Sequence, residues 1–167
     1  MDLRTKQKPL KDTYREDPAQ ALVTLTARGS ETDAPISCSV DIGRAVYEAQ
    51  AHPGVGGAGT GACSGDLLLG ALAACAQLTC QMVATSMGLE ANSIETLVEG
   101  DLDLRGTLGL DRDVGAGFSE IRLRFEVDAP NASQDDLDAL HRKTERYCTV
   151  FQTLANSPKL STRIAPG

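Results

Sequence analysis

The sequence predicts an α+β fold in which antiparallel strands accompany one long apolar helix and a second, amphipathic helix. The first observation is the segment 67–87, which is apolar and has no broad polar face. The second is that apolar and polar residues alternate in segments on both sides of it, as they do in half-buried strands. The third is a capped segment with helical spacing that begins at Ser133.

Length and composition favour one soluble domain. The chain has 167 residues, and we expect a polar extension over residues 1–20 followed by a single domain over residues 21–167. Lysine and arginine number 16 against 23 acidic residues, the net charge is −7, and tryptophan is absent. Such a chain lacks the basic face and the stacking platform of nucleic-acid-binding proteins, so we expect no nucleic-acid partner.

Two segments indicate where in the cell the protein is located. Residues 1–18 are mostly polar or charged and lack the apolar stretch of a secretory signal. Polar residues interrupt the segment 67–87, which therefore suits burial in protein better than in lipid. We expect a cytoplasmic protein that does not contact membranes.

The first strands are predicted before the long helix. Apolar residues alternate with polar ones at 21–27 and 36–42, a third strand is possible at 44–49, and a turn-rich stretch occupies 28–35. Residues 51–65 are rich in glycine and have no hydrophobic period, so they predict an irregular loop. The three strands would form a meander that leads into the loop.

The long helix has start and stop signals. Ser64 is a candidate N-cap, Asp66 lies in the predicted first turn, and Gly88 occupies the place of a left-handed C-terminal residue. At 1.5 Å per residue the helix would be about 33 Å long. Because it is apolar nearly all round, we expect neighbours on every side.

Further strands and a second helix follow Gly88. Alternation at 94–105 and 121–128 predicts two antiparallel strands joined by a turn at 106–117. Ser133 and Asp136 form a capping-box pattern, after which one helical stripe gathers Leu137, Leu140, Thr144 and Cys148. A short helical turn and a last strand at 160–164 would complete the chain.

Five cysteines raise the possibility of redox chemistry. An odd number in a reducing compartment makes a static disulfide framework improbable. We interpret Cys38, Cys63 and Cys80 as packing residues, since free cysteine behaves as a small buried hydrophobe. Cys75 and Cys148 differ because each lies on a predicted inward-facing helix surface within a recognisable stretch.

These stretches carry a resemblance to a known family. The matching residues are Gly56 and Gly57, the run DLLLGALAAC from Asp66 to Cys75, and ERYC ending at Cys148. In these residues, and in their order over residues 23–164, the chain resembles the osmotically inducible protein C and organic hydroperoxide resistance (OsmC/Ohr) family.

The resemblance implies a fold and an activity. The fold would be an intertwined homodimer of α+β subunits in which antiparallel sheets wrap a long central helix and a second helix carries the later cysteine. The activity would be reduction of organic hydroperoxides, with Cys75 as the peroxidatic and Cys148 as the resolving cysteine. An external dithiol, such as a lipoyl-type reductant, would recycle the enzyme, and no cofactor is implied.

A peroxidatic cysteine must be ionised. An ordinary cysteine pKa of about 8.5 leaves little thiolate at neutral pH, and the apolar neighbours of Cys75 would raise that pKa. The family uses an arginine held by an acidic residue; Arg28 and Arg44 are candidates for that arginine, and Asp66 for the residue that orients it. Asp66 has a second interpretation as N-terminal helix charge. Thr149 stands where relatives commonly have proline.

Other interpretations remain open. The first is a binding or structural protein for a small apolar ligand, with thiols that do not turn over. A zinc module is disfavoured because the cysteines are scattered and no CxxC pair occurs. We interpret His52 and His141 as solvated side chains rather than bases or ligands.

Overall fold

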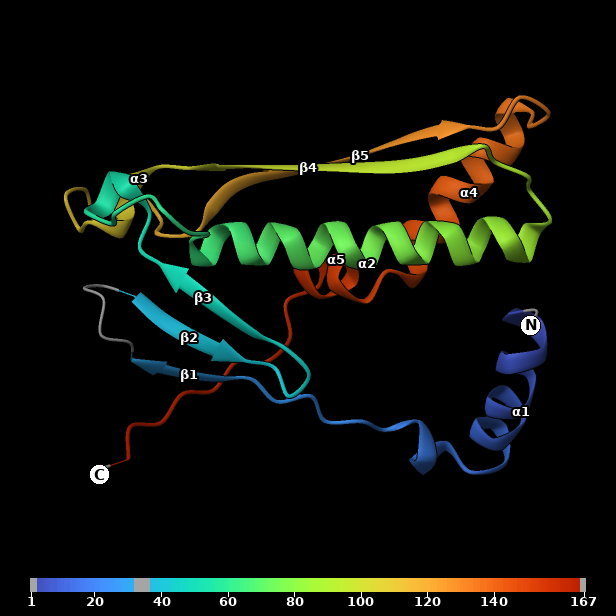
Figure 1. Cartoon of the computed structure of the whole chain (residues 1–167), viewed down its shortest axis with the longest axis horizontal. Coiled ribbons are helices and arrows are strands. Elements are labelled where there is room, and N and C mark those ends of the chain that lie inside the picture. Colours follow the sequence, from blue (N-terminus) through green and yellow to red (C-terminus); the bar gives the residue numbers. More distant parts are fainter. Residues whose placement is uncertain (1–2, 32–36, 166–167) are drawn as a thin grey trace. The chain divides into compact units, whose positions relative to one another are not determined.

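The structure, a computed structural model, describes residues 3–31 and 37–165 (Figure 1). The chain packs as two compact units, one formed by residues 1–70 and 97–124 and the other by residues 71–96 and 125–167. The long helix and the two longest strands contribute to both. The prediction of a single domain over residues 21–167 stays a prediction.

The first unit begins with a helix that the sequence pattern did not predict. α1 (Leu3–Glu16) lies inside the expected polar extension. Asp12 accepts hydrogen bonds from Lys8 at 2.8 Å and from Arg15 at 2.7 Å, the spacing at which charged side chains meet on a helix surface. A 3-10 turn, η1 (Pro18–Ala21), follows.

Three short strands form an antiparallel sheet in the order β1-β2-β3. They are β1 (Arg28–Glu31), β2 (Ser37–Asp41) and β3 (Val46–Gln50), with Cys38 opposite the buried Ala49. The predictions for β2 and β3 are confirmed, although Ile36 of the predicted segment lies outside the described residues. The predicted strand at 21–27 is wrong.

The pairing explains this error. Residues 22–27 carry an alternating pattern but have no strand partner, and their apolar side chains are exposed. β1 instead lies within the stretch predicted to be turn, where its backbone pairs with β2. Backbone pairing determines a strand, and alternation alone does not supply the partner.

The long helix is confirmed as α2 (Ser64–Met87), preceded by a glycine-rich loop that contains the 3-10 turn η2 (Pro53–Val55). Its start differs from the prediction because Ser64 is the first helical residue rather than the N-cap. The Asp66 carboxylate accepts a hydrogen bond from the backbone N–H of Cys63, the residue before the helix, at 2.8 Å. Gly88 ends the helix with φ 71°, as predicted.

Helix α2 is long and apolar enough to cross a membrane by length and composition. This is weak evidence, because the core helix of a soluble protein meets the same criterion. Its residues Cys80, Val83 and Ala84 form a buried cluster with Leu140. Leu68, Leu78 and Met82 are exposed, so the prediction that neighbours cover this helix on every side is wrong for the described residues.

Two long strands, β4 (Ser93–Leu102) and β5 (Phe118–Asp128), form the second sheet (Figure 1). A short helix, α3 (Leu104–Thr107), follows β4, so that strand ends before the predicted residue 105. A Cβ at Gly100 would lie 2.6 Å from the Phe118 ring. Glycine therefore lets the aromatic ring lie against the β4 backbone.

The second unit contains both later helices. α4 (Gln134–Tyr147) opens with the predicted capping box between Ser133 and Asp136, and α5 (Thr149–Ala155) follows after one residue. The predicted strand at 160–164 is wrong: residues 157–165 form no strand, and Ile164 is 97% exposed. No described segment pairs with residues 157–165, so this alternating segment, like residues 22–27, has no partner strand.

Candidate functional site

The two cysteines singled out from the sequence both lie in the second unit. Cys75 is half-buried in α2, and Cys148 is fully buried at the single residue between α4 and α5. Cys148 donates its backbone N–H to the Thr144 carbonyl at 2.9 Å and accepts the Gln152 N–H at 2.9 Å. Cys148 is therefore the C-cap of α4 and the N-cap of α5, and its backbone bonds to both helices.

The sequence pattern explains the burial of Cys148. Leu140 and Thr144 precede it on one stripe of α4, and both are buried. Residues at this spacing lie above one another on a helix face, so the stripe carries Cys148 into the core. The predicted stripe is confirmed, with α4 ending one residue before the cysteine.

Cys75 and Cys148 are neighbours in the fold, because each side chain acts on the pKa of the other. The two residues are separated along the chain by β4 and β5, and the second unit brings them together. Proximity of this kind is a requirement for a disulfide between two thiols.

The surroundings of Cys75 favour its thiolate. Burial acts against ionisation, yet hydrogen bonds from the Val150 amide, the Cys148 thiol, the Thr79 hydroxyl and the Thr149 amide together lower the Cys75 pKa below its ordinary value. The two amides belong to the first turn of α5, whose N–H groups have no partner within that helix. Backbone donors thus favour the ionised form of Cys75, for which we expected an arginine.

The pKa of Cys148 is shifted in the other direction. Burial raises it first, and the adjacent Cys75 thiolate adds to the effect because a second negative charge would be repelled. The pKa values of the two thiols are therefore shifted in opposite directions, and Cys75 is the one whose ionised form its surroundings favour.

The candidate arginines have no place in these contacts. Arg28 begins β1 and Arg44 lies in the turn between β2 and β3; both side chains are exposed. Neither is among the groups that lower the Cys75 pKa. Which arginine, if any, serves Cys75 stays a prediction.

Asp66 caps the start of α2. Its pKa is lowered by the hydrogen bonds that it accepts at Cys63 and by the nearby His52. These contacts support its interpretation as N-terminal helix charge. Its role in orienting an arginine stays a prediction.

The remaining cysteines have packing surroundings. Cys80 is buried, and its pKa is raised by burial despite a hydrogen bond with Thr144. Cys63 is buried at the start of α2, and Cys38 is half-buried in β2. Burial without a stabilised charge makes a thiol a poor nucleophile, so Cys80 differs sharply from Cys75 on the same helix.

Both histidines are exposed. His52 caps η2, where its Nδ1 accepts the Gly54 N–H at 3.0 Å. His141 lies 3.5 Å from the Glu145 carboxylate, with the Phe125 ring edge-on to it. Among the described residues, no group of three or more His, Cys, Asp or Glu side chains could hold a metal ion.

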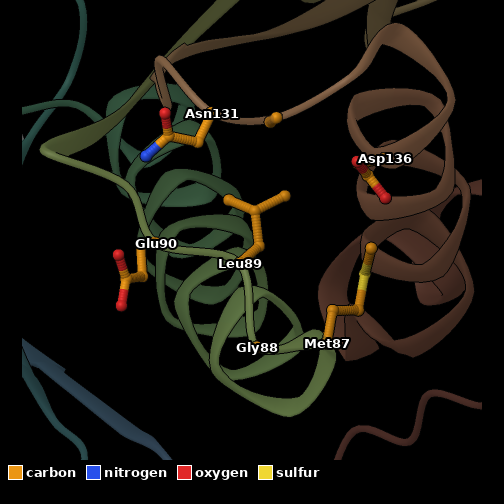
Figure 2. Close-up of a pocket in the computed structure, with 7 residues that line it drawn as sticks. Met87, Gly88, Leu89, Glu90, Asn131 and Asp136 are labelled. Carbon is orange, nitrogen blue, oxygen red and sulfur yellow. The ribbon is translucent and has the colours of Figure 1, made fainter.

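Neither of two pockets in the second unit is lined by Cys75 or Cys148. One, of about 210 Å³, lies between the end of α2 and the start of α4, with Met87, Leu89 and Asp136 around it (Figure 2). Met87 is twelve residues beyond Cys75, about 18 Å along the helix, so this pocket is remote from the sulfurs. The other, of about 420 Å³, adjoins the α4–α5 junction and is lined by residues that include Thr149.

Sequence reasoning missed three groups that contact Cys75: Thr79 and the amides of Thr149 and Val150. A backbone amide leaves no trace in residue type, and no pattern identified these donors. Thr79 did offer a signal, since it follows Cys75 by four residues and so shares its helix face.

Comparisons with known proteins identify the family of the chain. The model of the OsmC-like protein family matches residues 57–163. Solved structures that resemble the chain include an OsmC-like protein from Mycoplasma pneumoniae, with a TM-score of 0.68 and 20% identity over 81% of this chain and 89% of that chain. An organic hydroperoxide resistance protein from Elizabethkingia anophelis gives a TM-score of 0.64 and 18% identity over 81% and 91% of the two chains.

A third structure shows the same fold without an assigned activity. It is an OsmC-like protein of unknown function from Vibrio cholerae, with a TM-score of 0.65 and 13% identity over 79% of this chain and 94% of that chain. No curated protein sequence matches the chain. The structural likeness confirms the predicted α+β fold of the OsmC type. The family model covers more than half of the sequence, and the chain belongs to the OsmC-like protein family.

Proposed function

We propose that the protein is a cytoplasmic thiol peroxidase that reduces organic hydroperoxides to alcohols. The observation that carries the proposal is the proximity of Cys75 and Cys148, whose surroundings lower the pKa of Cys75 and raise the pKa of Cys148. A thiol peroxidase with a resolving cysteine needs this asymmetry, because one sulfur attacks the peroxide and the other reacts only afterwards, with the sulfenic acid.

The first half of the cycle oxidises Cys75. Its thiolate attacks one peroxide oxygen, the O–O bond breaks, and the released alkoxide takes a proton from solvent to become the alcohol. The sulfur keeps the other oxygen as a sulfenic acid, a two-electron oxidation. The Val150 and Thr149 amides hold the attacking thiolate in place.

The second half removes the oxygen. Cys148 loses its proton and attacks the Cys75 sulfur, an S–S bond forms, and hydroxide leaves and takes up that proton as water. An external dithiol then supplies two electrons and two protons, reopens the bridge and becomes a disulfide itself. A lipoyl-type reductant has the required chemistry, and the cycle uses no other cofactor.

We propose organic rather than small polar peroxides because aliphatic residues flank Cys75 on α2. Leu72 is buried, and Leu78 is exposed on the same helix. Apolar lining favours an alkyl chain, since it removes that chain from water.

The partner would be a second copy of the chain. Leu78 is 60% exposed and Met82 41% exposed on α2, whereas Leu72, Cys80 and Val83 of the same helix are buried. A face of this kind is more stable when a partner covers it, and self-association with twofold symmetry is the commonest solution.

Mass spectrometry after stoichiometric tert-butyl hydroperoxide tests the activity. We expect a disulfide between Cys75 and Cys148, loss of peroxide consumption in Cys75→Ser, and no change in the matched variant Cys80→Ser. In Cys148→Ser the bridge cannot form, so Cys75 should accumulate as sulfenic and then sulfinic acid. Full peroxide consumption by Cys75→Ser would refute the proposal.

The second candidate function is binding of a small apolar ligand without turnover, which the exposed aliphatic face of α2 also favours. The same experiment separates the two. A ligand-binding protein would bind the alkyl peroxide without forming the bridge or releasing the alcohol.

A further inference from the structure

The pocket at the α4–α5 junction lies beside Cys148. It has a volume of about 420 Å³, and its lining includes Tyr147 and Thr149, the residues on either side of Cys148 in the chain. Neighbouring Cα atoms are about 3.8 Å apart, so the pocket lies within one residue of this cysteine. A ligand bound there would lie close to a disulfide that includes Cys148.

One positive side chain gives this pocket its charge. Arg146 lines it, and none of the other described lining residues is charged. The Arg146 guanidinium lies 5.6 Å from the centroid of the Tyr147 ring, a cation–π contact that restricts the arginine side chain. The ion pairs among the described residues leave Arg146 without an acidic partner. In a chain of net charge −7, this pocket is suited to an anion.

Other polar groups of the pocket wall bond to the protein itself. Gln152 Nε2 donates to the Glu145 carbonyl at 2.9 Å, and the Asn156 amide donates to Gln152 Oε1 at 3.1 Å. The Thr153 hydroxyl donates to the Thr149 carbonyl at 2.8 Å. These bonds fix the wall and leave the guanidinium as its charged donor. A guanidinium pairs well with a carboxylate, because two parallel hydrogen bonds can form between them.

We propose that Arg146 binds the carboxylate of an acidic dithiol, so that this pocket is the subsite of the reductant in the proposed cycle. The assignment to the reductant rests on the proposed function, whereas binding of a carboxylate can be tested without turnover. The reductant is favoured over the peroxide because the bridge that it opens includes Cys148. The peroxide reacts at Cys75, which Leu72 and Leu78 flank on α2.

The turnover experiment compares dihydrolipoate with dihydrolipoamide, which has the same dithiol and chain but a neutral end group. With tert-butyl hydroperoxide as the oxidant, the wild type should show a kcat/KM about tenfold higher for the acid, the factor expected of a hydrogen bond between charged groups. Arg146→Gln removes the charge and should reduce the ratio to about one. Arg146→Lys should keep part of the preference, because lysine retains the charge but not the paired donors.

Arg142→Gln is the matched control, since Arg142 is an exposed arginine one turn earlier on α4 and does not line the pocket. It should keep the wild-type ratio. Equal kcat/KM values for acid and amide in the wild type, or an unchanged ratio in Arg146→Gln, would overturn the proposal. A preference that depends on Arg146 between a fatty-acid hydroperoxide and its methyl ester, but not between the two dithiols, would also overturn it, because the pocket would then serve the oxidant.

A binding measurement separates the subsite from the activity. Octanoate has the carboxylate and chain of dihydrolipoate without its sulfur atoms, and octanamide is the neutral equivalent. In an NMR titration of the full-length reduced chain, octanoate should bind about tenfold more tightly than octanamide, and Arg146→Gln should bind both equally. Such binding in a protein that consumes no peroxide would refute the proposed function and leave the carboxylate site established. Turnover without any discrimination that depends on Arg146 would refute the site and leave the function.

Discussion

Thr149 supplies the Cys75 thiolate with a backbone N–H that a proline at the same position would lack. Thr149 is the first residue of α5, and Cys148 before it has φ −73° and ψ 106°. Proline is favoured at the first position of a helix, and the residue before a proline prefers this extended conformation. The site therefore offers a substitution that removes one donor without disturbing the fold.

We expect Thr149→Pro to raise the Cys75 pKa, since one of the hydrogen bonds to the thiolate is lost. The shift should be about half to one unit, and the free energy of unfolding should stay the same or rise slightly. Chemical denaturation and pH-dependent labelling of Cys75 measure the two quantities. Thr149→Ala retains the N–H and provides the comparison; a proline variant with the wild-type Cys75 pKa would contradict the assignment of this donor.

The chemistry of single side chains was only partly predictable. The pairing of Cys75 with Cys148 came from a family resemblance, because a spacing of 73 positions carries no geometric information by itself. The charge expected near Cys75 was an arginine, whereas the donors found are amides and a hydroxyl. The sequence shows which residues carry a positive side chain. It does not show that the backbone amides at the start of α5 lie close to Cys75.

The start of α2 depends on Asp66, which accepts the backbone N–H of Cys63. We expect Asp66→Ala to lower the free energy of unfolding by about 0.5–1 kcal/mol, the range of a helix cap at an exposed position. Because the Asp66 pKa is lowered in the folded state, its contribution is complete above the ordinary aspartate pKa and is lost as pH falls through the lower folded value.

Denaturation curves at several pH values check this expectation. The difference between wild type and Asp66→Ala should be full at neutral pH and should shrink below about pH 4. Asp135→Ala is a suitable control, since Asp135 also lies in the first turn of a helix, α4. A difference that persists unchanged in acid would show that the carboxylate charge is not what stabilises α2.

Helices were predicted better than strands, for a physical reason. The end of α2 and the start of α4 follow from signals next to the segments, namely Gly88 and the Ser133 capping box. The strands predicted at 21–27 and 160–164 fail because a strand requires a partner that its own sequence does not identify. Alternation indicates which face of a segment is apolar. It does not indicate which other segment accepts and donates the backbone hydrogen bonds.

The exposed face of α2 leads to a prediction about the assembly. Leu78→Asp places a charge where the proposed homodimer would bury an apolar side chain, so the dimer should dissociate at concentrations where the wild type associates. Sedimentation velocity measures the change as a lower mass. Leu110→Asp alters another exposed leucine, in the loop after α3, and should leave the mass unchanged. A wild-type chain that sediments as a monomer would disprove the homodimer.

The burial of Cys148 has a kinetic consequence for the proposed cycle. Oxidant and reductant both need access to sulfur, and only Cys75 of the pair is partly open. Alcohol must therefore depart before the dithiol arrives, and the two substrates compete for one entrance. Double-reciprocal plots against peroxide at several dithiol concentrations should run parallel, as for a ping-pong enzyme.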